Sequence, residues 1–285
     1  MTARLIKGDE VAEEVRAEIS SELKDLYDGT GYVAGLAVIV VGENPTSLAY
    51  ISNCEKQGEK MGISIQVHRL DQNISQEELL EIIEELNDDF FIHGIMIQMP
   101  LPEHLDHKVI VETIDPDKDV EGVHPITMGK LFSDEKSFIP CTAHSIMKMI
   151  EHTRQPVYGK SAVIIGRSNI VGKPLSLLLL RRNASITICH TGTVNLPDIC
   201  READIVVAAA GTPYMVEGNW IKQDAIVLDV GVTQVEDKMV GDVNFQECRE
   251  VASWISPVPG GVGPLTITML MWNTLEAFRK KMDRI

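Results

Sequence analysis

One segment of the chain has both the residue types and the spacing that suit a phosphate-binding turn. It reads Ser-Ala-Val-Ile-Ile-Gly-Arg-Ser-Asn-Ile-Val-Gly-Lys-Pro over residues 161–174. The apolar run ending at Gly166 predicts a buried strand, and the residues that follow predict a helix. The first turn of such a helix points backbone N–H groups at a bound pyrophosphate. The segment predicts a dinucleotide site, with an ordinary strand–helix turn as the alternative, because its glycines depart from Gly-x-Gly-x-x-Gly.

The end of the next predicted strand bears on which dinucleotide would bind. Residues 185–189 form that strand, and His-Thr-Gly-Thr follows at 190–193. In a doubly wound sheet the adenosine ribose lies here, and an acidic residue would bind the ribose hydroxyl of NAD. The segment contains no acidic residue, whereas Arg167 can pair with a 2′-phosphate. These residues favour NADP, with NAD as the alternative.

Elements that can position such a site alternate along the chain. Short apolar runs alternate with segments of helical period, which predicts parallel strands joined by crossover helices. The expected strands are 36–41, 63–68, 94–99, 161–166, 185–189, 205–209 and 225–230; the expected helices are 9–26, 45–61, one beginning at Ser75, 170–182 and 265–282. The fold class is α/β with two domains. The first is expected to cover residues 1–140 plus a C-terminal helix at about 265–285, and the second, Rossmann-like and dinucleotide-binding, residues 141–264.

Composition narrows the class of protein. The chain has 285 residues, 44% hydrophobic and 24% charged, with a formal net charge of −16, which disfavours nucleic acid and anionic membranes as partners. Its five cysteines form no Cys-x-x-Cys pair, so neither a disulfide framework nor a zinc site is expected. His104 and His107 lack a third ligand, and no metal is expected. Residues 1–7 lack the apolar core of a signal peptide, so a cytoplasmic location is expected.

Several ordered blocks resemble one family, the bifunctional methylenetetrahydrofolate dehydrogenase/methenyltetrahydrofolate cyclohydrolases. The similarity runs along almost the whole chain, and several well-spaced blocks are far more specific than any one of them. The blocks are Val-Gly-Glu-Asn-Pro at 41–45 with Ser47 and Tyr50, Gln-Met-Pro-Leu-Pro at 98–102, Lys-Asp-Val-Glu-Gly-Val-His-Pro at 118–125, Pro-Cys-Thr at 140–142, the turn at 166–174, Gly-Asp-Val at 241–243 and Pro-Val-Pro-Gly-Gly-Val-Gly-Pro at 257–264.

The resemblance implies an enzyme of one-carbon metabolism that oxidises 5,10-methylenetetrahydrofolate with NADP or NAD. It also implies a folate cleft between the two domains and a homodimer paired through the cofactor domains. The implied catalytic residues are Tyr50, Gln98 and the residues at positions 54 and 121. The implied folate-binding residues are Tyr50, Gln98, Pro259, Gly260, Gly261 and Gly263, and the implied cofactor-binding residues are Gly166, Arg167, Ser168, Gly172, Thr191 and Val232.

The chain departs from the family pattern mainly where the second reaction, hydrolysis of the methenyl product, needs proton transfer. The family's lysine four residues after the tyrosine is Cys54, and its aspartate against the pterin is Glu121. Residues 143–145 read Ala-His-Ser in place of Pro-x-Gly, and Gly192 replaces a basic residue. A thiol cannot replace an ammonium, and Lys56 points about 200° round the helix from position 54. We therefore expect dehydrogenase activity with weak or absent hydrolysis.

Three alternatives remain open at this stage. The enzyme is fully bifunctional despite Cys54; or it accepts a different one-carbon carrier; or it is an idle paralogue that only binds folate. Cys54 itself is expected to be a buried small hydrophobe and not a nucleophile. The intact phosphate turn argues against the idle paralogue.

Overall fold

A computed structural model describes residues 2–284. The chain divides into two compact units, and each is described by itself. Unit 1 comprises residues 2–14 and 141–266, and unit 2 comprises residues 15–140 and 267–284. The chain passes from one unit to the other within helix α1 (Gly8–Thr30) and near the start of helix α10 (Val262–Met282).

Unit 1 is built on a six-stranded parallel sheet. Its strand order is β1-β11-β8-β7-β5-β6. From β5 the chain adds β6 on one side and then β7 and β8 on the other, which is the doubly wound order with its switch point between β5 and β7. The strands are β1 (Arg4–Leu5), β5 (Ser161–Ile165), β6 (Ser185–Cys189), β7 (Ile205–Ala208), β8 (Ile226–Asp229) and β11 (Trp254–Ile255). The helical elements are α6 (Cys141–His152), α7 (Gly172–Arg181), α8 (Leu196–Arg201), η1 (Gly218–Trp220) and α9 (Phe245–Arg249).

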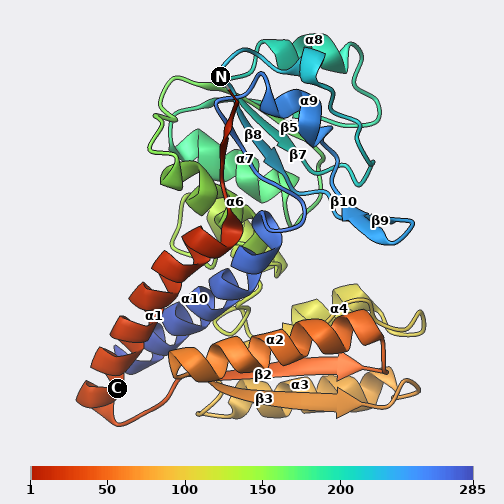
Figure 1. Cartoon of the computed structure of the whole chain (residues 1–285). Coiled ribbons are helices and arrows are strands. Elements are labelled where there is room, and N and C mark those ends of the chain that lie inside the picture. The colour runs from red at the N-terminus through yellow and green to blue at the C-terminus, as the bar shows by residue number, and fades with distance from the viewer. Residues whose placement is uncertain (1, 285) are drawn as a thin grey trace. The chain divides into compact units, whose positions relative to one another are not determined.

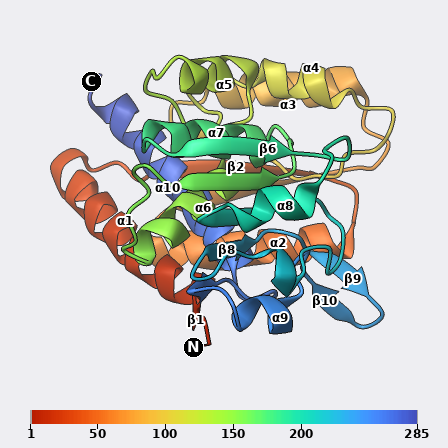
Figure 2. The ribbon, with the colours of Figure 1, turned by 90° about the horizontal axis from the view of Figure 1, so that it is seen from above.

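The sheet of unit 1 is buried at its centre, as a parallel sheet covered by helices must be. Every residue of β7 and β8 is buried. Helix α7 packs against β5 and β6 (Figure 2). A two-stranded antiparallel hairpin, β9 (Thr233–Val235) and β10 (Lys238–Val240), extends from this unit and was not expected from the sequence. Its strands have only three residues each, too few for a clear period of two.

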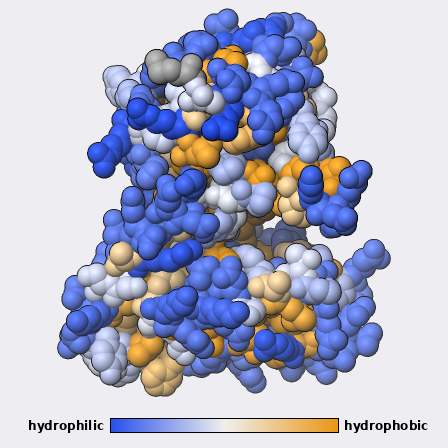
Figure 3. Space-filling model, viewed as in Figure 1, coloured by the Kyte–Doolittle hydropathy of each residue, from blue (hydrophilic) through white to orange (hydrophobic). Residues whose placement is uncertain are grey.

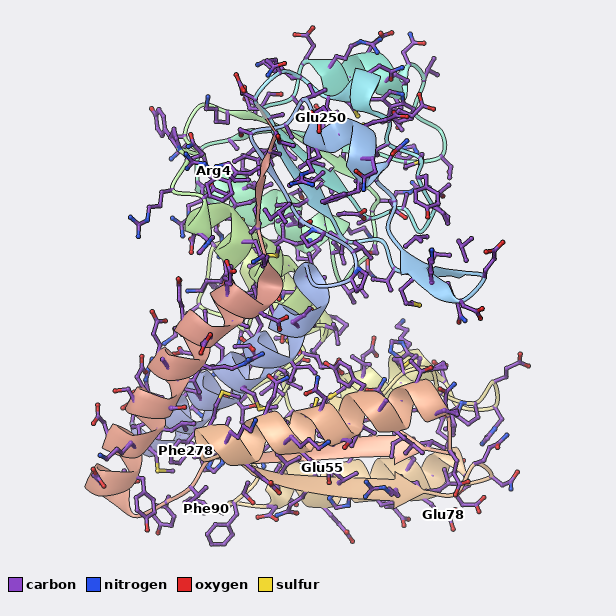
Figure 4. The ribbon with its side chains drawn as sticks, in the orientation of Figure 1. Arg4, Glu55, Glu78, Phe90, Glu250 and Phe278 are labelled. Atoms are coloured by element: carbon purple, nitrogen blue, oxygen red, sulfur yellow. The ribbon has the colours of Figure 1, made fainter. Side chains whose placement is uncertain are left out.

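The N-terminus differs from the expected domain division. Residues 2–14 belong to unit 1, whereas residues 1–140 were expected in the first domain. The reason is a long-range pairing: β1 lies parallel to β11, with Arg4 opposite Trp254. Arg4, labelled in Figure 4, also places its guanidinium 5.4 Å from the centre of the Trp254 ring. A two-residue strand has no local signature, so only the fold reveals it.

Unit 2 has a three-stranded parallel sheet in the order β3-β2-β4. The strands are β2 (Gly35–Val41), β3 (Ser64–Leu70) and β4 (Gly94–Ile97), and the helices are α2 (Pro45–Met61), α3 (Gln76–Asp88), α4 (His107–Thr113) and α5 (Pro125–Phe132). Helices α2 and α3 run on opposite faces of this sheet (Figure 1). Alternate β2 residues, Ala37, Ile39 and Val41, pack with the apolar side chains of α3 and α4.

Local capping explains where the helices of unit 2 begin. Asn44 accepts hydrogen bonds from the N–H groups of Thr46 and Ser47, and Pro45 occupies the first turn of α2. Ser75 and Glu78 form a reciprocal capping box at the start of α3, where Figure 4 labels Glu78. The helix expected to begin at Ser75 is confirmed.

The surface seen in Figure 3 is largely hydrophilic. Apolar side chains gather at the β9–β10 hairpin, where Val232 is 59% exposed and Met239 is 44% exposed. Among the described residues, no helix is both long and apolar enough to cross a bilayer.

Candidate functional site

The strand–turn–helix predicted at residues 161–174 is present in unit 1, and two of its positions accept only glycine. Gly166 has φ of 128°, and a Cβ atom there would lie 2.2 Å from the carbonyl oxygen of Ala209. A Cβ atom at Gly172 would lie 2.2 Å from the carbonyl oxygen of Gly166. The backbone is therefore tightly packed at the carboxyl ends of β5 and β7. This is the position at which doubly wound sheets bind nucleotides.

Hydrogen bonds within the turn fix the start of α7. The Ser168 hydroxyl accepts a hydrogen bond from the Val171 N–H at 3.2 Å, and the Ser168 carbonyl accepts one from the Lys173 N–H. Within the described part of the chain, no side chain caps the first turn of α7. The N–H groups of Val171, Lys173 and Leu175 are hydrogen-bonded within the turn and Pro174 has none, so it is the positive end of the helix dipole that favours a pyrophosphate here. Arg167 is exposed beside this turn.

The segment after β6 forms a tight turn. The His190 N–H donates to the Thr193 hydroxyl at 2.8 Å, and the Thr193 N–H donates to the His190 carbonyl at 2.8 Å. Thr191, at the tip, is exposed. The Gly166 N–H donates to the Cys189 carbonyl at 2.9 Å, which places this turn beside the start of the phosphate turn.

A pocket of about 400 Å³ within unit 1 brings together five of the residues that were expected to bind ligands. Its lining includes Val232, Pro259, Gly260, Gly261 and Gly263. Gly260 has φ of 96°, and the peptide bond between Val258 and Pro259 is cis. The turn residues bend this loop so that its backbone forms one wall of the pocket.

Asp229 also lines this pocket, and sequence reasoning did not assign it a role. Burial raises its pKa to about 6, and the charge of Asp242 adds to the rise, while N–H groups of Val243, Asp242 and Gly231 oppose it. A carboxylate at the end of a predicted buried strand, two residues before Gly231, is the signal that would have identified it. Cβ atoms at Gly231 or Gly241 would overlap Asp242 or Asp229.

In unit 2, Tyr50 and Cys54 lie one turn apart on α2. Cys54 is fully buried. Burial raises the pKa of its thiol to about 12, the charges of Glu121 and Glu55 add smaller contributions, and a hydrogen bond with the Tyr50 side chain opposes them. Cys54 is therefore a neutral thiol at physiological pH. Lys56 is exposed, in agreement with its expected direction on the helix.

Glu121 reaches the end of β4. Its Oε2 accepts a hydrogen bond from the Ile97 N–H at 3.3 Å. Burial raises its pKa to about 7, the charge of Asp119 adds to the rise, and the Ile97 N–H opposes it. The carboxyl group therefore exchanges a proton close to neutral pH.

Gln98 directly follows β4, and only one end of its side-chain amide is hydrogen-bonded among the described residues. Its Nε2 donates to the Met99 carbonyl at 2.8 Å, and the Ser47 hydroxyl donates to the same carbonyl at 3.3 Å. Its Oε1 is buried and has no hydrogen-bond partner among the described residues. A buried acceptor without a donor is costly, so this atom is suited to a donor on a ligand or on a longer side chain at a nearby position.

The structure thus brings Tyr50, Cys54 and Glu121 into one cluster in unit 2, with Gln98 adjacent to Ile97, the hydrogen-bond partner of Glu121. It places the predicted cofactor residues together at the strand ends of unit 1. Among residues 2–284, no three His, Cys, Asp or Glu side chains are arranged to hold a metal ion.

Comparison with known proteins decides the family. Residues 6–121 match the catalytic-domain model of tetrahydrofolate dehydrogenase/cyclohydrolase, and residues 140–282 match its NAD(P)-binding domain. The chain belongs to this family. The resemblance seen in the sequence is confirmed, as are the two-domain α/β class and the presence of a nicotinamide dinucleotide-binding domain.

Relatives match over their full length. The bifunctional protein FolD of Moorella thermoacetica is 48% identical over 281 residues, 98% of this chain and 100% of that protein. The crystal structure of the bifunctional FolD enzyme from Campylobacter jejuni is 40% identical, with a TM-score of 0.95, covering 99% of this chain and 100% of that one. The FolD enzyme of Trypanosoma brucei, solved with NADP and an inhibitor, is 36% identical, with a TM-score of 0.94 and 99% of both chains covered.

Proposed function

We propose that this chain oxidises 5,10-methylenetetrahydrofolate to 5,10-methenyltetrahydrofolate with NADP, and hydrolyses the product to 10-formyltetrahydrofolate slowly or not at all. One observation supports fast oxidation combined with slow or absent hydrolysis. The dinucleotide turn of unit 1 keeps both of its obligatory glycines, whereas position 54 of unit 2 carries a buried neutral thiol in place of an amine.

We assign the cofactor to unit 1. Gly166 and Gly172 let the backbone of the turn pack against the carbonyl oxygens of Ala209 and Gly166, and Ser168 accepts the Val171 N–H, so the turn is held in the shape proposed to receive the pyrophosphate. Arg167 and Thr191 are assigned to the adenosine end, and Val232 to the nicotinamide end. The bound nicotinamide would supply the hydride acceptor. The protein's contribution is to hold it, because hydride transfer requires alignment at about 3–3.5 Å more than it requires side-chain chemistry.

We assign the pterin to Tyr50, Gln98 and Glu121 in unit 2, and a further folate contact to residues 259–263. The buried Gln98 Oε1 supplies an acceptor for an N–H donor of the pterin. The methenyl product is a cation, so an ionised Glu121 stabilises the charge that develops as the hydride leaves. With a pKa of about 7, Glu121 is ionised above neutral pH, and oxidation should be faster on the alkaline side.

The chain lacks the lysine that the family resemblance implies for proton transfer during hydrolysis. Water attack on the methenyl carbon must be followed by proton transfers, which a positioned group of matched pKa accelerates by about 10²–10⁴. Cys54, with a pKa of about 12, neither takes nor gives a proton readily near neutral pH. We therefore expect methenyltetrahydrofolate to accumulate during turnover.

The two reactions should be measured separately on the purified protein. One assay follows NADPH formation from methylenetetrahydrofolate and NADP; the other follows loss of the methenyl absorbance when methenyltetrahydrofolate is added alone. We expect rapid NADPH formation and hydrolysis close to the uncatalysed rate. Rapid hydrolysis of added methenyltetrahydrofolate would contradict the proposal, and absence of NADPH formation would contradict the dehydrogenase assignment itself.

A second candidate is a fully bifunctional enzyme in which Glu121 transfers the proton. The observation in its favour is the pKa of about 7, which suits a general acid or base at neutral pH. In that case hydrolysis would be rapid and would be lost in Glu121→Gln, whereas Cys54→Ser would leave it unchanged.

A homodimer paired through unit 1 is part of the proposal. Strand β6 lies at the edge of the six-stranded sheet, and apolar side chains are exposed on it and just beyond it, with Ile188 at 37% and Val194 at 76%. An exposed apolar sheet edge is a ready site for association. Analytical ultracentrifugation should give twice the chain mass; a concentration-independent monomer would exclude the dimer.

A further inference from the structure

The Gly-Asp-Val segment at residues 241–243 is one of the blocks behind the family resemblance, and the proposed function gives it no role. Its central residue, Asp242, is fully buried. The Oδ2 atom of Asp242 accepts hydrogen bonds from the N–H groups of Ala210, at 2.6 Å, and Gly211, at 2.9 Å. These two residues follow β7, so the Asp242 side chain fixes the loop at the carboxyl end of a central strand.

A second buried carboxylate holds the backbone around Asp242. Asp229, the last residue of β8, accepts the Asp242 N–H at Oδ1, at 2.9 Å, and the Val243 N–H at Oδ2, at 3.0 Å. Its Oδ1 also accepts the Gly231 N–H at 3.0 Å. The two carboxylates therefore connect three segments that are distant in the sequence and that follow β7, β8 and β10 (Figure 1).

The other oxygen of Asp242 shows that folding alone does not account for this side chain. Oδ1 is buried and has no hydrogen-bond partner among residues 2–284. A Cβ atom at Gly231 would overlap the Asp242 carboxylate and lie 2.8 Å from the Asp242 backbone nitrogen. A buried acceptor without a donor costs free energy, so a carboxylate at this position lowers stability relative to a fully paired side chain.

The strands whose ends are connected in this way lie on one side of the switch point of the sheet. β7 and β8 lie on that side, and β5 and β6 lie on the other. A dinucleotide bound across a doubly wound sheet has one nucleotide over each side. The adenosine end is assigned to the turn after β6, so the nicotinamide half is assigned to the ends of β7 and β8, where Asp229 and Val232 line the pocket of unit 1.

The phosphate turn is held by contacts of its own. The Ala209 N–H donates to the Ile165 carbonyl at 2.8 Å, and the Ala209 carbonyl packs against Gly166. The next two residues along the chain are the ones whose N–H groups donate to Asp242. Loss of the Asp242 carboxylate should therefore release the loop beyond Ala209 and leave the phosphate turn in place.

We propose that Asp242 is a positioning residue for hydride transfer, because it holds the loop after β7 that supports the nicotinamide ring. This rests on the proposed function, which assigns the dinucleotide to unit 1. Asp242 itself touches neither substrate nor cofactor and acts through the N–H groups of Ala210 and Gly211. Hydride transfer depends on alignment, and a misplacement of about 1 Å lowers a rate by about 10²-fold.

The test compares Asp242→Ala with the native protein. We expect kcat for the oxidation of methylenetetrahydrofolate to fall by about 10²-fold and NADP to bind about tenfold more weakly. Adenosine 2′,5′-bisphosphate, which has the adenosine half of NADP without the nicotinamide, should bind with about the same affinity to both proteins.

Asp204→Ala is the matched control. Asp204 also accepts a backbone N–H, from Ser161 at 3.0 Å, but it does so at the amino ends of β5 and β7, away from the proposed site. We expect this variant to lose stability and to keep kcat within about twofold of the native value.

Asp242→Asn separates hydrogen bonding from charge. It keeps an oxygen in reach of both N–H groups and should retain kcat within about fivefold. Equal losses of kcat in Asp242→Asn and Asp242→Ala would mean that the charge matters and not the hydrogen bonds. Equal losses of affinity for NADP and adenosine 2′,5′-bisphosphate in Asp242→Ala would mean that Asp242 only supports the fold. Either result, or an unchanged kcat in Asp242→Ala, overturns the proposal.

Two provisions keep the test decisive. If Asp242→Ala does not fold, Asp242→Ser takes its place, because its hydroxyl is too short to reach both N–H groups. If the native protein binds NADP but oxidises no methylenetetrahydrofolate, the proposed function fails. The contrast between NADP and adenosine 2′,5′-bisphosphate then still tests Asp242, because it requires neither folate nor turnover.

Discussion

The phosphate turn of unit 1 and the Tyr50–Glu121 cluster of unit 2 serve the same proposed pathway but tolerate change very differently. The turn depends on its backbone geometry, and its two glycines are required because a Cβ atom at either would lie 2.2 Å from a neighbouring carbonyl oxygen. The cluster works through side chains on α2 and after β4, whose exchange leaves the backbone in place. Backbone chemistry is thus tied to the fold, whereas side-chain chemistry can be lost while the fold remains.

The largest expected effect comes from restoring an amine at position 54. In Cys54→Lys, the ammonium would lie close to the carboxyl group of Glu121, whose charge already acts on position 54. We expect hydrolysis of methenyltetrahydrofolate to rise by about 10²–10⁴, the range typical of a positioned acid–base group. The assay is the decay of methenyl absorbance.

Cys54→Ser is the matched control, because it keeps a small neutral side chain and should not raise hydrolysis. Cys54→Lys could fold, keep its dehydrogenase activity and still not hydrolyse the methenyl form. In that case another residue of the cluster, and not Cys54 alone, would prevent hydrolysis.

Gly166→Ala should disrupt the phosphate turn of unit 1. Its φ of 128° is strained for any L side chain, and the added Cβ would overlap the Ala209 carbonyl oxygen, so we expect roughly 2–5 kcal/mol of lost stability together with weaker NADP binding. Thermal unfolding and NADP titration measure the two effects. Gly129→Ala in α5, where a Cβ meets nothing within 4 Å, should leave stability the same or slightly higher. If Gly166→Ala and Gly129→Ala had similar stability, the phosphate turn would not require glycine at position 166.

Glu121 should make the stability of the protein depend on pH. Its folded pKa of about 7 lies above the ordinary value of 4.5, so the folded state binds the proton more tightly and stability falls as pH rises from about 4.5 to 7. Removing the ionisable group in Glu121→Gln should recover up to about 3 kcal/mol at pH 8 and nothing at pH 4. Denaturant unfolding at the two pH values measures this, and equal gains at both would point to packing instead of charge.

The smallest effect is expected for Ser168→Ala. This change removes the hydroxyl that accepts the Val171 N–H and should cost about 1 kcal/mol, seen as a modest loss of NADP affinity or of thermal stability. Ser176→Ala on α7, whose hydroxyl bonds only a carbonyl within its own helix, is the control and should change NADP affinity less. A larger loss in the control would mean that the turn does not depend on Ser168.

Local patterns predicted many elements closely. Helix α2 begins and ends at the expected residues, because Asn44, Pro45 and Gly62 mark both of its ends. The strand before the phosphate turn was expected at 161–166 and is observed as Ser161–Ile165. The short strand β1 and the hairpin β9–β10 were missed, since they are defined by pairing with distant or very short segments.

The sequence by itself determined the α/β class, the family, the glycine turn and the substitution at position 54, because periodicity, glycine placement and residue identity are properties of the chain. Only the tertiary structure decided the protonation of Cys54 and Glu121 and left the buried Gln98 Oε1 without a hydrogen-bond partner among residues 2–284. Each of these depends on how far water is excluded and which donors are nearby, and those conditions arise only when segments distant in sequence pack together.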